Sequence, residues 1–344
     1  MGLKILILGS GGREHAISWI ISKSKREIEK IYVMPGNAGT LSEKNVFNIE
    51  CDINNHQAVL NFALENNIDL TIVGPEVPLV EGISDLFEEN NLNIFGPKKY
   101  FAQLEGSKVF SKNFMDSNNL PTASYKEFDD SKKAKDYLND KKMPIVIKYD
   151  GLAAGKGVDI CETIDAAKNS IDNLLKPEEK IIIEDFIKGI ELSAIYICNP
   201  NANKKNIGLT WIKDYKSRDE YNSGPNTGGM GAVTHPFCAY KKNDIYSLNV
   251  EIEKILIKTI VAINNGSGTT SRYNGFMYLG LMISTHDDKP YLLEYNCRMG
   301  DPETQNILMY LDKNEVDFLD LIGFDNSQYP CLLYTSPSPR DLDL

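Results

Sequence analysis

Residues 3–15 read LKILILGSGGREH and decide the fold class of this chain. An apolar run ends in glycines and leads into a helical pattern, which indicates a strand followed by a turn and a helix. Similar runs separated by helical patterns recur along the first hundred residues, at 30–33, 70–73 and 93–95, with helices near 14–25, 56–66 and 81–90. The alternation predicts βαβ units and a parallel sheet, which binds ligands at the carboxyl ends of its strands.

The composition indicates a globular protein of two or three packed units. The chain has 344 residues, of which 42% are hydrophobic and 25% charged, an ordinary balance for such proteins. Its formal net charge of −11 argues against nucleic acid as a partner. No apolar run approaches the roughly 18 residues that cross a membrane, and no basic leader precedes the first strand. The six cysteines are scattered without a Cys-x-x-Cys pair, so we expect reduced thiols and a cytoplasmic location.

The first glycine loop, GSGGREH (9–15), is a candidate phosphate site, because its N–H groups and the following helix N-terminus attract anions. Glu14 stands where a dinucleotide-binding loop needs its third glycine, and the second strand leads into PGNAGT (35–40) without an acidic residue. An NAD enzyme is therefore disfavoured. The glycines either tighten a turn or hold the phosphate of a sugar substrate, with Asn37 and Glu76 available for hydroxyls or an amine.

A second glycine-rich stretch, DGLAAGKG (150–157), has some features of a nucleotide P-loop. Its spacing is wrong, because three residues separate Gly151 from Gly155 and a glycine replaces the Ser or Thr that holds magnesium. Apolar runs at 145–148 and 158–161 flank it. The stretch is either a structural hairpin or, in better agreement with its three glycines and lysine, a flexible hairpin over a triphosphate, with Lys148 reaching a phosphate.

Two further segments leave alternatives open. IIIEDFI (181–187) is either a buried strand with a solvated end or a hinge whose backbone binds adenine, with Glu191 accepting ribose hydroxyls. GPNTGGMG (224–231) is either a flexible linker or a loop that approaches a ligand with its backbone, because its four glycines leave few side chains in the way.

The run YLLEYNCRMGDPETQ (291–305) predicts a metal site. Residues 291–295 alternate as in a strand, which puts Glu294 and Asn296 on one face. Two oxygen ligands with Arg298 just beyond suit Mg²⁺ bridged to phosphates, since Mg²⁺ usually takes one or two protein ligands. An edge strand with a polar face is the alternative, although it does not explain the charged turn that follows.

The remaining pattern indicates a boundary near residue 103. A helix over about 104–120 is expected to end at Pro121, followed by a unit with β-type runs over about 121–190 and a larger unit to about 325. The segment 326–344 has no periodicity and is rich in Ser and Pro. We expect a disordered tail without chemistry, whose origin as part of the natural chain is open.

Taken together, the motifs resemble the ATP-grasp ligases and, among them, the phosphoribosylamine–glycine ligase family. The matching blocks follow the family order: GSGGREHA (9–16), PGNAGT (35–40), IVGPE (72–76), FGP (95–97), QLEGSK (103–108), IVIKYDGLAAGKGV (145–158), GPNTGGMGA (224–232) and LEYNCRMGDPETQ (293–305). The hairpin and the metal strand are shared by many ATP-grasp enzymes, whereas GGREH, PGNAGT and GPNTGGMG are narrower. The resemblance implies an α/β protein with a Rossmann-like N-terminal domain (1–103) and a two-subdomain ATP-grasp domain of the α+β type (104–325), which includes a small lid (about 121–190).

The resemblance also implies the reaction and the roles of residues. ATP, glycine and 5-phosphoribosylamine would give ADP, phosphate and glycinamide ribonucleotide through glycyl phosphate, in de novo purine synthesis. Mg²⁺ (or Mn²⁺) would bind Glu294 and Asn296, while Arg298, Asp301 and Lys156 would face the reacting groups. ATP would contact Lys108, Lys148, Gly151, Gly155, Gly157, Glu184, Asp185, Phe186, Ile187 and Glu191. The other substrates would contact Gly11, Gly12, Arg13, Glu14, Asn37, Gly39, Thr40, Pro75, Glu76, Asn226, Thr227 and Gly228.

Two departures from the family pattern matter. Tyr215 stands where many relatives have His, within Asp214-Tyr-Lys-Ser-Arg218. Family members also continue into a further β-rich domain, so this chain is expected to be truncated. The alternatives are therefore a weak or inactive ATP-binding fragment and another ATP-grasp carboxylate–amine ligase. We expect a monomer or part of a larger multifunctional chain, with no nucleic-acid or membrane partner.

Overall fold

The N-terminal part of the chain is built on a parallel sheet. The computed structural model describes residues 2–152, 157–201, 206–220, 223–234 and 245–324. Its first sheet has the order β3-β2-β1-β4-β5, with all pairs parallel. The strands are β1 (Leu3–Gly9), β2 (Ile28–Pro35), β3 (Val46–Asn48), β4 (Leu70–Val73) and β5 (Ile94–Phe95). The predicted parallel sheet is confirmed; β3, only three residues long, was not predicted.

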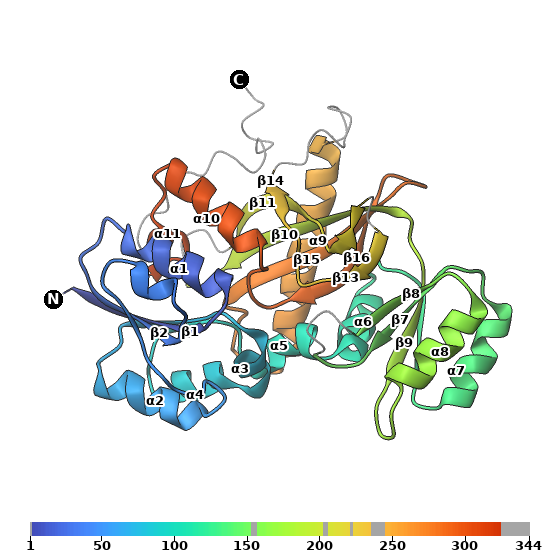
Figure 1. The fold of residues 1–344 in the computed structure, drawn as a ribbon, viewed down its shortest axis with the longest axis horizontal. Helices are drawn as coiled ribbons and strands as arrows, with labels where there is room; N and C mark the ends of the chain where they lie inside the picture. Colours follow the sequence, from blue (N-terminus) through green and yellow to red (C-terminus); the bar gives the residue numbers. More distant parts are fainter. Residues whose placement is uncertain (1, 153–156, 202–205, 221–222, 235–244, 325–344) are drawn as a thin grey trace.

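Both faces of this sheet are covered, which explains the continuous apolar run of β1. Ile5 and Ile7 pack toward α1 (Gly12–Ser22), whereas Leu6 and Leu8 belong to the core shared with α2 (His56–Glu65) and α4 (Ile83–Glu89). Figure 1 shows α1 on one side of the sheet and α2, α3 (Glu76–Glu81) and α4 on the other. A short 3-10 turn, η1 (Thr40–Ser42), follows β2.

Of the next two predicted helices, one is confirmed and one is interrupted. The helix predicted near 81–90 is α4, which begins directly after Gly82; this glycine, with a φ of +103°, also ends α3. The helix predicted over 104–120 consists of α5 (Lys99–Gly106) and α6 (Lys108–Ser117). Ser107 between them has extended backbone angles, and its hydroxyl accepts a hydrogen bond from the Phe110 N–H at 3.0 Å. This N-cap starts a new helix at Lys108.

A small antiparallel sheet follows, in the order β6-β9-β7-β8. Its strands are β6 (Tyr125–Phe128), β7 (Ile145–Tyr149), β8 (Val158–Cys161) and β9 (Ile181–Asp185). Alternate residues such as Ile145, Ile147 and Ile183 pack under α7 (Ser131–Tyr137), η2 (Leu138–Asp140) and α8 (Ile164–Leu174). The opposite face carries Lys148 and Glu184 toward the rest of the molecule.

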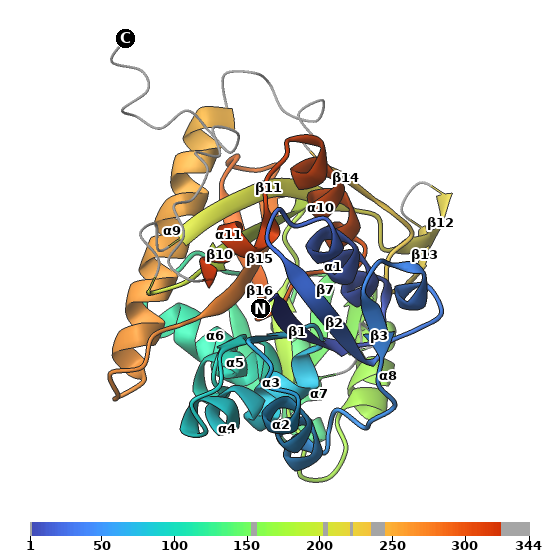
Figure 2. The ribbon, with the colours of Figure 1, turned by 90° about the vertical axis from the view of Figure 1, so that its left-hand side faces the viewer.

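The largest part is a mainly antiparallel sheet in the order β14-β11-β10-β15-β16. Its strands are β10 (Gly189–Cys198), β11 (Asn206–Asp214), β14 (Ala232–Thr234), β15 (Gly275–Ser284) and β16 (Pro290–Asn296), with a ribbon of β12 (Ser217–Asp219) and β13 (Ser223–Asn226) beside them. Helix α9 (Ile245–Gly266) covers one face. Helices α10 (Glu303–Lys313) and α11 (Phe318–Leu321) cover the other and also pack against α1, so this sheet and the N-terminal sheet share one core (Figure 2).

Some predictions fall outside this description or stay untested. The domain limits stay predictions, and the tail 326–344 lies outside the described residues. Cys51, Cys161, Cys198 and Cys297, the cysteines within the described ranges, are free. In the part of the chain that the structure describes, no helix is both long and apolar enough to span a bilayer.

Candidate active site

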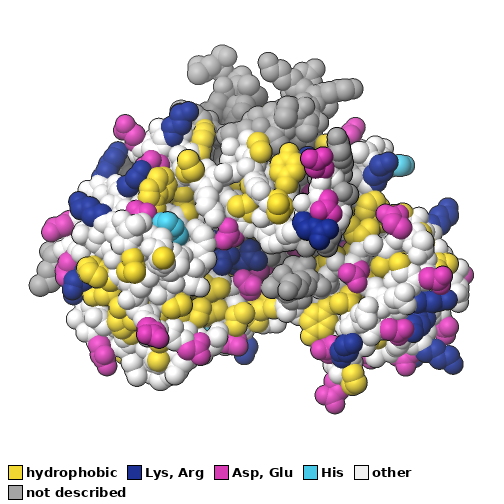
Figure 3. Space-filling view, in the orientation of Figure 1, with side chains coloured by type: hydrophobic (Ala, Val, Ile, Leu, Met, Phe, Trp, Pro, Cys, Tyr) yellow, Lys and Arg dark blue, Asp and Glu magenta, His cyan; other side chains and the backbone are white. Residues whose placement is uncertain are grey.

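A cavity of about 370 Å³ lies where α5, α6, the small sheet and the central sheet meet. Figure 3 shows a hollow in the middle of this face, with basic and acidic side chains at its floor. The cavity brings together predicted residues from every part of the chain: Glu76, Lys108, Lys148, Gly151, Gly157, Glu184, Asp185, Phe186, Ile187, Glu191, Thr227, Gly228, Glu294, Asn296, Arg298 and Asp301. Gly155 and Lys156 lie outside the described residues, as does the side chain of Asn226.

Glu294 and Asn296 lie on β16, the strand predicted at this position. Glu294 pairs with Gly280 and Leu292 with Leu281, so Leu293 is the extra residue of a β-bulge. The Leu293 carbonyl accepts a hydrogen bond from Lys148 Nζ at 3.1 Å. The bulge therefore ties the candidate metal strand to the small sheet.

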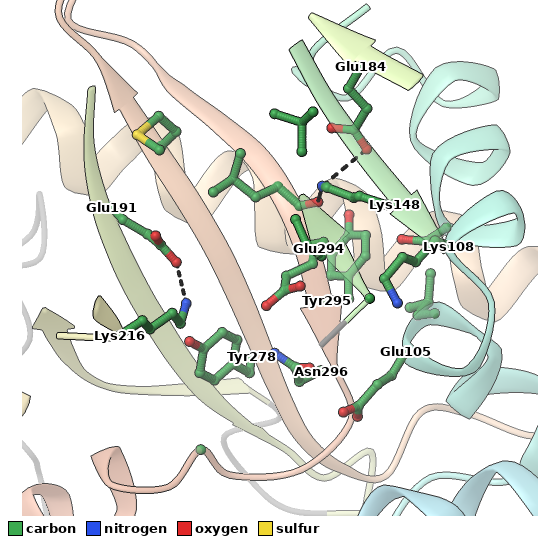
Figure 4. A pocket seen from close by; sticks show the side chains of 18 of the residues that line it. Glu105, Lys108, Lys148, Glu184, Glu191, Lys216, Tyr278, Glu294, Tyr295 and Asn296 are labelled. Carbon is green, nitrogen blue, oxygen red and sulfur yellow. Dashed lines mark hydrogen bonds and ion pairs between the residues drawn. The ribbon is translucent and has the colours of Figure 1, made fainter. Parts of the chain in front are cut away.

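The charges around Glu294 favour its ionised form. Burial would raise its pKa, but Lys216, Lys148, Lys108 and Arg298 together lower it. Figure 4 shows Glu294 between the Lys216–Glu191 pair and the Lys148–Glu184 pair. Within the described residues, no hydrogen bond or ion pair occupies its carboxylate. An ionised carboxylate without a protein partner, two positions from an amide oxygen, fits the ligand set of Mg²⁺.

No cluster of three or more His, Cys, Asp or Glu side chains suited to a metal occurs in the described ranges. Mg²⁺ usually takes only one or two protein ligands, with waters and substrate phosphates as the rest. Glu294 and Asn296 would supply the protein part of such a site.

A buried network of charges joins α6 to both sheets. Glu184 forms ion pairs with Lys148 at 3.0 Å and with Lys112 at 3.1 Å. Lys112 also donates to the Thr122 hydroxyl at 2.6 Å, which donates to the Leu292 carbonyl at 2.7 Å. Lys112 was not predicted from the sequence, although its spacing of four from Lys108 puts both lysines on one face of α6.

The start of the glycine hairpin is fixed at the N-terminus of α6. The Asp150 carboxylate accepts from the Ser107 hydroxyl at 2.9 Å and from the Val109 N–H at 3.1 Å. Lys108 Nζ donates to the Gly151 carbonyl at 2.8 Å. Gly151 has a φ of +144°, a conformation that favours glycine. The lysine predicted to hold phosphate thus stands beside the hairpin predicted to cover it.

Arg298 is held by two carboxylates from distant parts of the chain. Its guanidinium lies 3.2 Å from Glu76 at the start of α3 and 2.8 Å from Glu105 on α5. Glu105 also accepts from the Cys297 N–H at 2.7 Å and its thiol at 3.0 Å. Glu105 lies in the QLEGSK block, but the sequence analysis gave it no role.

The predicted substrate loops border the cavity. Arg13 donates from its guanidinium to the Met299 carbonyl at 2.9 Å and from its N–H to Asp301 at 3.3 Å. The Asn37 amide is engaged inside its own loop, since it donates to the Ser10 carbonyl at 2.8 Å and accepts from the Gly39 N–H at 2.7 Å. Among the predicted residues of these loops only Glu76 lines the cavity. The others do not: Gly11, Gly12, Arg13, Glu14, Asn37, Gly39, Thr40 and Pro75. Their substrate contacts stay predictions.

The opposite end of the cavity contains residues that the sequence analysis did not assign. Lys216 forms an ion pair with Glu191 and lies 3.4 Å from Asp214. Tyr278 donates to Glu303 at 3.0 Å. Tyr215, which replaces the His of many relatives, is 40% exposed and does not line the cavity. The substitution therefore lies outside the cavity itself.

Comparisons with known proteins agree with this arrangement. Residues 3–105 match the family model of the phosphoribosylglycinamide synthetase N domain, and residues 106–304 match that of its ATP-grasp (A) domain. A phosphoribosylamine–glycine ligase of Clostridium acetobutylicum is 43% identical over 328 residues, covering 93% of this chain and 74% of the relative. The chain belongs to the phosphoribosylamine–glycine ligase family.

Further relatives and solved structures are also similar to this chain, in sequence or in fold. The Escherichia coli O157:H7 ligase is 39% identical, over 92% of this chain and 72% of its own length. The crystal structure of the Thermotoga maritima ligase has a TM-score of 0.70 and 32% identity, with 89% of this chain and 72% of that chain covered. N5-carboxyaminoimidazole synthetase of Staphylococcus aureus, at a TM-score of 0.67 and 14% identity, covers 96% of this chain and 79% of that chain and shares the fold. The predicted fold class and family are thus confirmed.

Proposed function

We propose that this chain joins glycine to 5-phosphoribosylamine at the expense of ATP, with glycinamide ribonucleotide, ADP and phosphate as products, in purine biosynthesis. Membership of the ligase family supports the reaction class. The observation that carries the proposal is the carboxylate of Glu294, which four nearby cations keep ionised and which has no hydrogen-bond or ion-pair partner among the described residues of the cavity. Cations and positioned oxygen ligands are what phosphoryl transfer requires.

The nucleotide would lie along the small sheet. The ends of β9 and the following residues (184–187) line the cavity beside Glu191, where adenosine would bind. Lys108 and Lys148 would contact phosphates from α6 and β7. Glu294 and Asn296 would hold Mg²⁺, which when bound neutralises phosphate charge.

The two chemical steps use different groups of the two small substrates. A carboxylate oxygen of glycine attacks the γ-phosphoryl group, giving glycyl phosphate and ADP. The amine of phosphoribosylamine then attacks the acyl carbon, phosphate leaves and the amine loses a proton. Arg298 connects the N-terminal part of the chain to the metal strand. It lies two residues after the end of β16 and forms an ion pair with Glu76 at the start of α3. The cavity must exclude bulk water during the reaction, because water hydrolyses acyl phosphates.

The proposal is tested by product analysis with purified protein, ATP, Mg²⁺, glycine and phosphoribosylamine. Glycinamide ribonucleotide, ADP and phosphate should form in equal amounts. Glu294→Gln should lower turnover by at least about a hundredfold, because an amide replaces the charged metal ligand. Glu89→Gln removes the same charge from an exposed position on α4 and should leave turnover unchanged.

ATP hydrolysis that does not depend on glycine, or turnover with L-alanine at the same rate, would contradict the proposal. Wild-type turnover in Glu294→Gln would contradict the metal assignment alone. The choice between Mg²⁺ and Mn²⁺, a monomeric state and a cytoplasmic location stay predictions.

A further inference from the structure

Asp214, at the end of β11, has a buried carboxylate oxygen without a partner. Its side chain is 4% exposed and lines the cavity. One oxygen lies 3.4 Å from Lys216 Nζ, whereas the other, Oδ1, accepts no hydrogen bond from any described residue. A buried acceptor without a donor is costly, so this oxygen calls for a donor other than the described residues, such as a ligand in the cavity.

Carboxylates outnumber cations at this end of the cavity. Glu191, Asp214 and Glu303 all line it, and Lys216 is already in an ion pair with Glu191. Glu303 receives its hydrogen bonds from two neutral hydroxyls, those of Tyr278 at 3.0 Å and Ser193 at 3.3 Å. Burial raises the pKa of Asp214; Lys216 opposes the shift and Glu303 adds to it. A cationic group of a ligand would restore the balance of charge.

This end of the cavity adjoins the metal strand. Lys216 lies beside Asp214, and both residues line the same cavity as Glu294. Figure 4 shows Lys216 on the same side of the cavity as Tyr278, across from Lys148 and Glu184. A ligand in this cavity with its carboxylate toward the metal strand can therefore direct an ammonium group toward Asp214.

We infer that Asp214, with Glu303 beside it, binds the ammonium group of the amino-acid substrate. The inference rests on the proposed function and deepens it, because it assigns the residues that distinguish an amino acid from a plain carboxylic acid. Asp214 would accept a charge-assisted hydrogen bond at Oδ1, and Glu303 would contribute its negative charge.

The test measures binding of labelled glycine by equilibrium dialysis, in the presence of Mg²⁺ and a non-hydrolysable ATP analogue. Asp214→Asn should weaken glycine binding by about tenfold or more, the effect expected for losing a charge-assisted hydrogen bond. Affinity for the analogue and the half-saturating Mg²⁺ concentration should stay within about twofold. Asp219→Asn is the matched control, since it makes the same change in an exposed ion pair with Arg218 and should leave glycine binding unchanged.

Each outcome separates this inference from the proposed function. Unaltered protein that binds no glycine would overturn both. The assignment of Asp214 to the ammonium group would be refuted, and the ligase function left intact, by either of two results. One is unchanged glycine affinity in Asp214→Asn. The other is a changed Mg²⁺ requirement without a change in glycine affinity. If Asp214→Asn fails to fold, the affinity of the unaltered protein for glycolate is measured instead. Glycolate keeps the carboxylate of glycine and has a hydroxyl in place of the ammonium group. It should bind at least about tenfold more weakly than glycine. Equal binding would refute the inference.

Discussion

Replacing Lys112 with Met should change stability in a way that depends strongly on pH. Lys112 lies on α6 with its side chain 2% exposed, 3.1 Å from the equally buried Glu184. Burial lowers the pKa of Lys112 from 10.5 to about 8, because the attraction of Glu184 only partly offsets the loss of water. Glu184 keeps a second partner, Lys148 at 3.0 Å, when Lys112 is removed.

The direction of the pH dependence follows from where the proton binds. Above a pH of about 8 the folded protein releases the Lys112 proton, while the unfolded chain keeps it until about 10.5. The unfolded state then binds more protons, so the folded state gains stability as pH rises. With these two pKa values the unaltered protein gains about 2 kcal/mol between about pH 7 and about pH 9.5, a gain that Lys112→Met lacks.

The assay is urea denaturation of both proteins at the two pH values, followed by circular dichroism. The destabilising effect of Lys112→Met should increase by about 2 kcal/mol from the lower to the higher pH. Lys135→Met, which removes an exposed ion pair with Asp172, should cost less than about 1 kcal/mol at both. A difference between unaltered protein and Lys112→Met that stays constant, or shrinks as pH rises, would refute the reasoning.

Two further predictions concern the frame of the site. Glu105→Gln should destabilise the protein by about 1–3 kcal/mol, because Arg298 loses one of its two carboxylate partners and keeps Glu76. The exposed change Glu88→Gln should cost less than about 1 kcal/mol, and equal denaturation midpoints would contradict this. Gly74→Ala should cost about 1–3 kcal/mol, because its Cβ would lie 2.0 Å from the Glu14 carboxylate. Thermal melting checks it, and an unchanged melting temperature would show that Glu14 moves aside freely.

Much of the site was predictable because its motifs are short and local. The alternation along 291–295 is enough to place Glu294 and Asn296 on one face, since neighbouring residues on a strand always alternate. The glycines of 150–157 similarly predict a hairpin from their own conformational freedom. The interruption at Ser107 was missed because helical residues continue on both sides of it, and only the N-cap at Ser107 separates α5 from α6.

The partners of these motif residues could not be predicted. Glu105 binds the Cys297 N–H across 192 residues, and Arg298 reaches Glu76 across 222. A buried carboxylate such as Asp214 looks like any surface acid in the sequence, because burial is a property of the surrounding elements and not of the residue. The interaction energies of these charges depend on the exclusion of water and on the positions of neighbouring groups, and both are set by the folded structure.

The sequence by itself determined the parallel N-terminal sheet, the glycine loops and the acidic strand, because each depends on interactions within a few residues of chain. The packing of three sheets around one cavity decided which charges face each other. This packing lowers the pKa of Lys112 and keeps Glu294 ionised. Among the described residues it leaves Glu294 without a partner and one buried oxygen of Asp214 without a donor. Electrostatic energies depend on distance and on the exclusion of water, and both exist only in the folded chain.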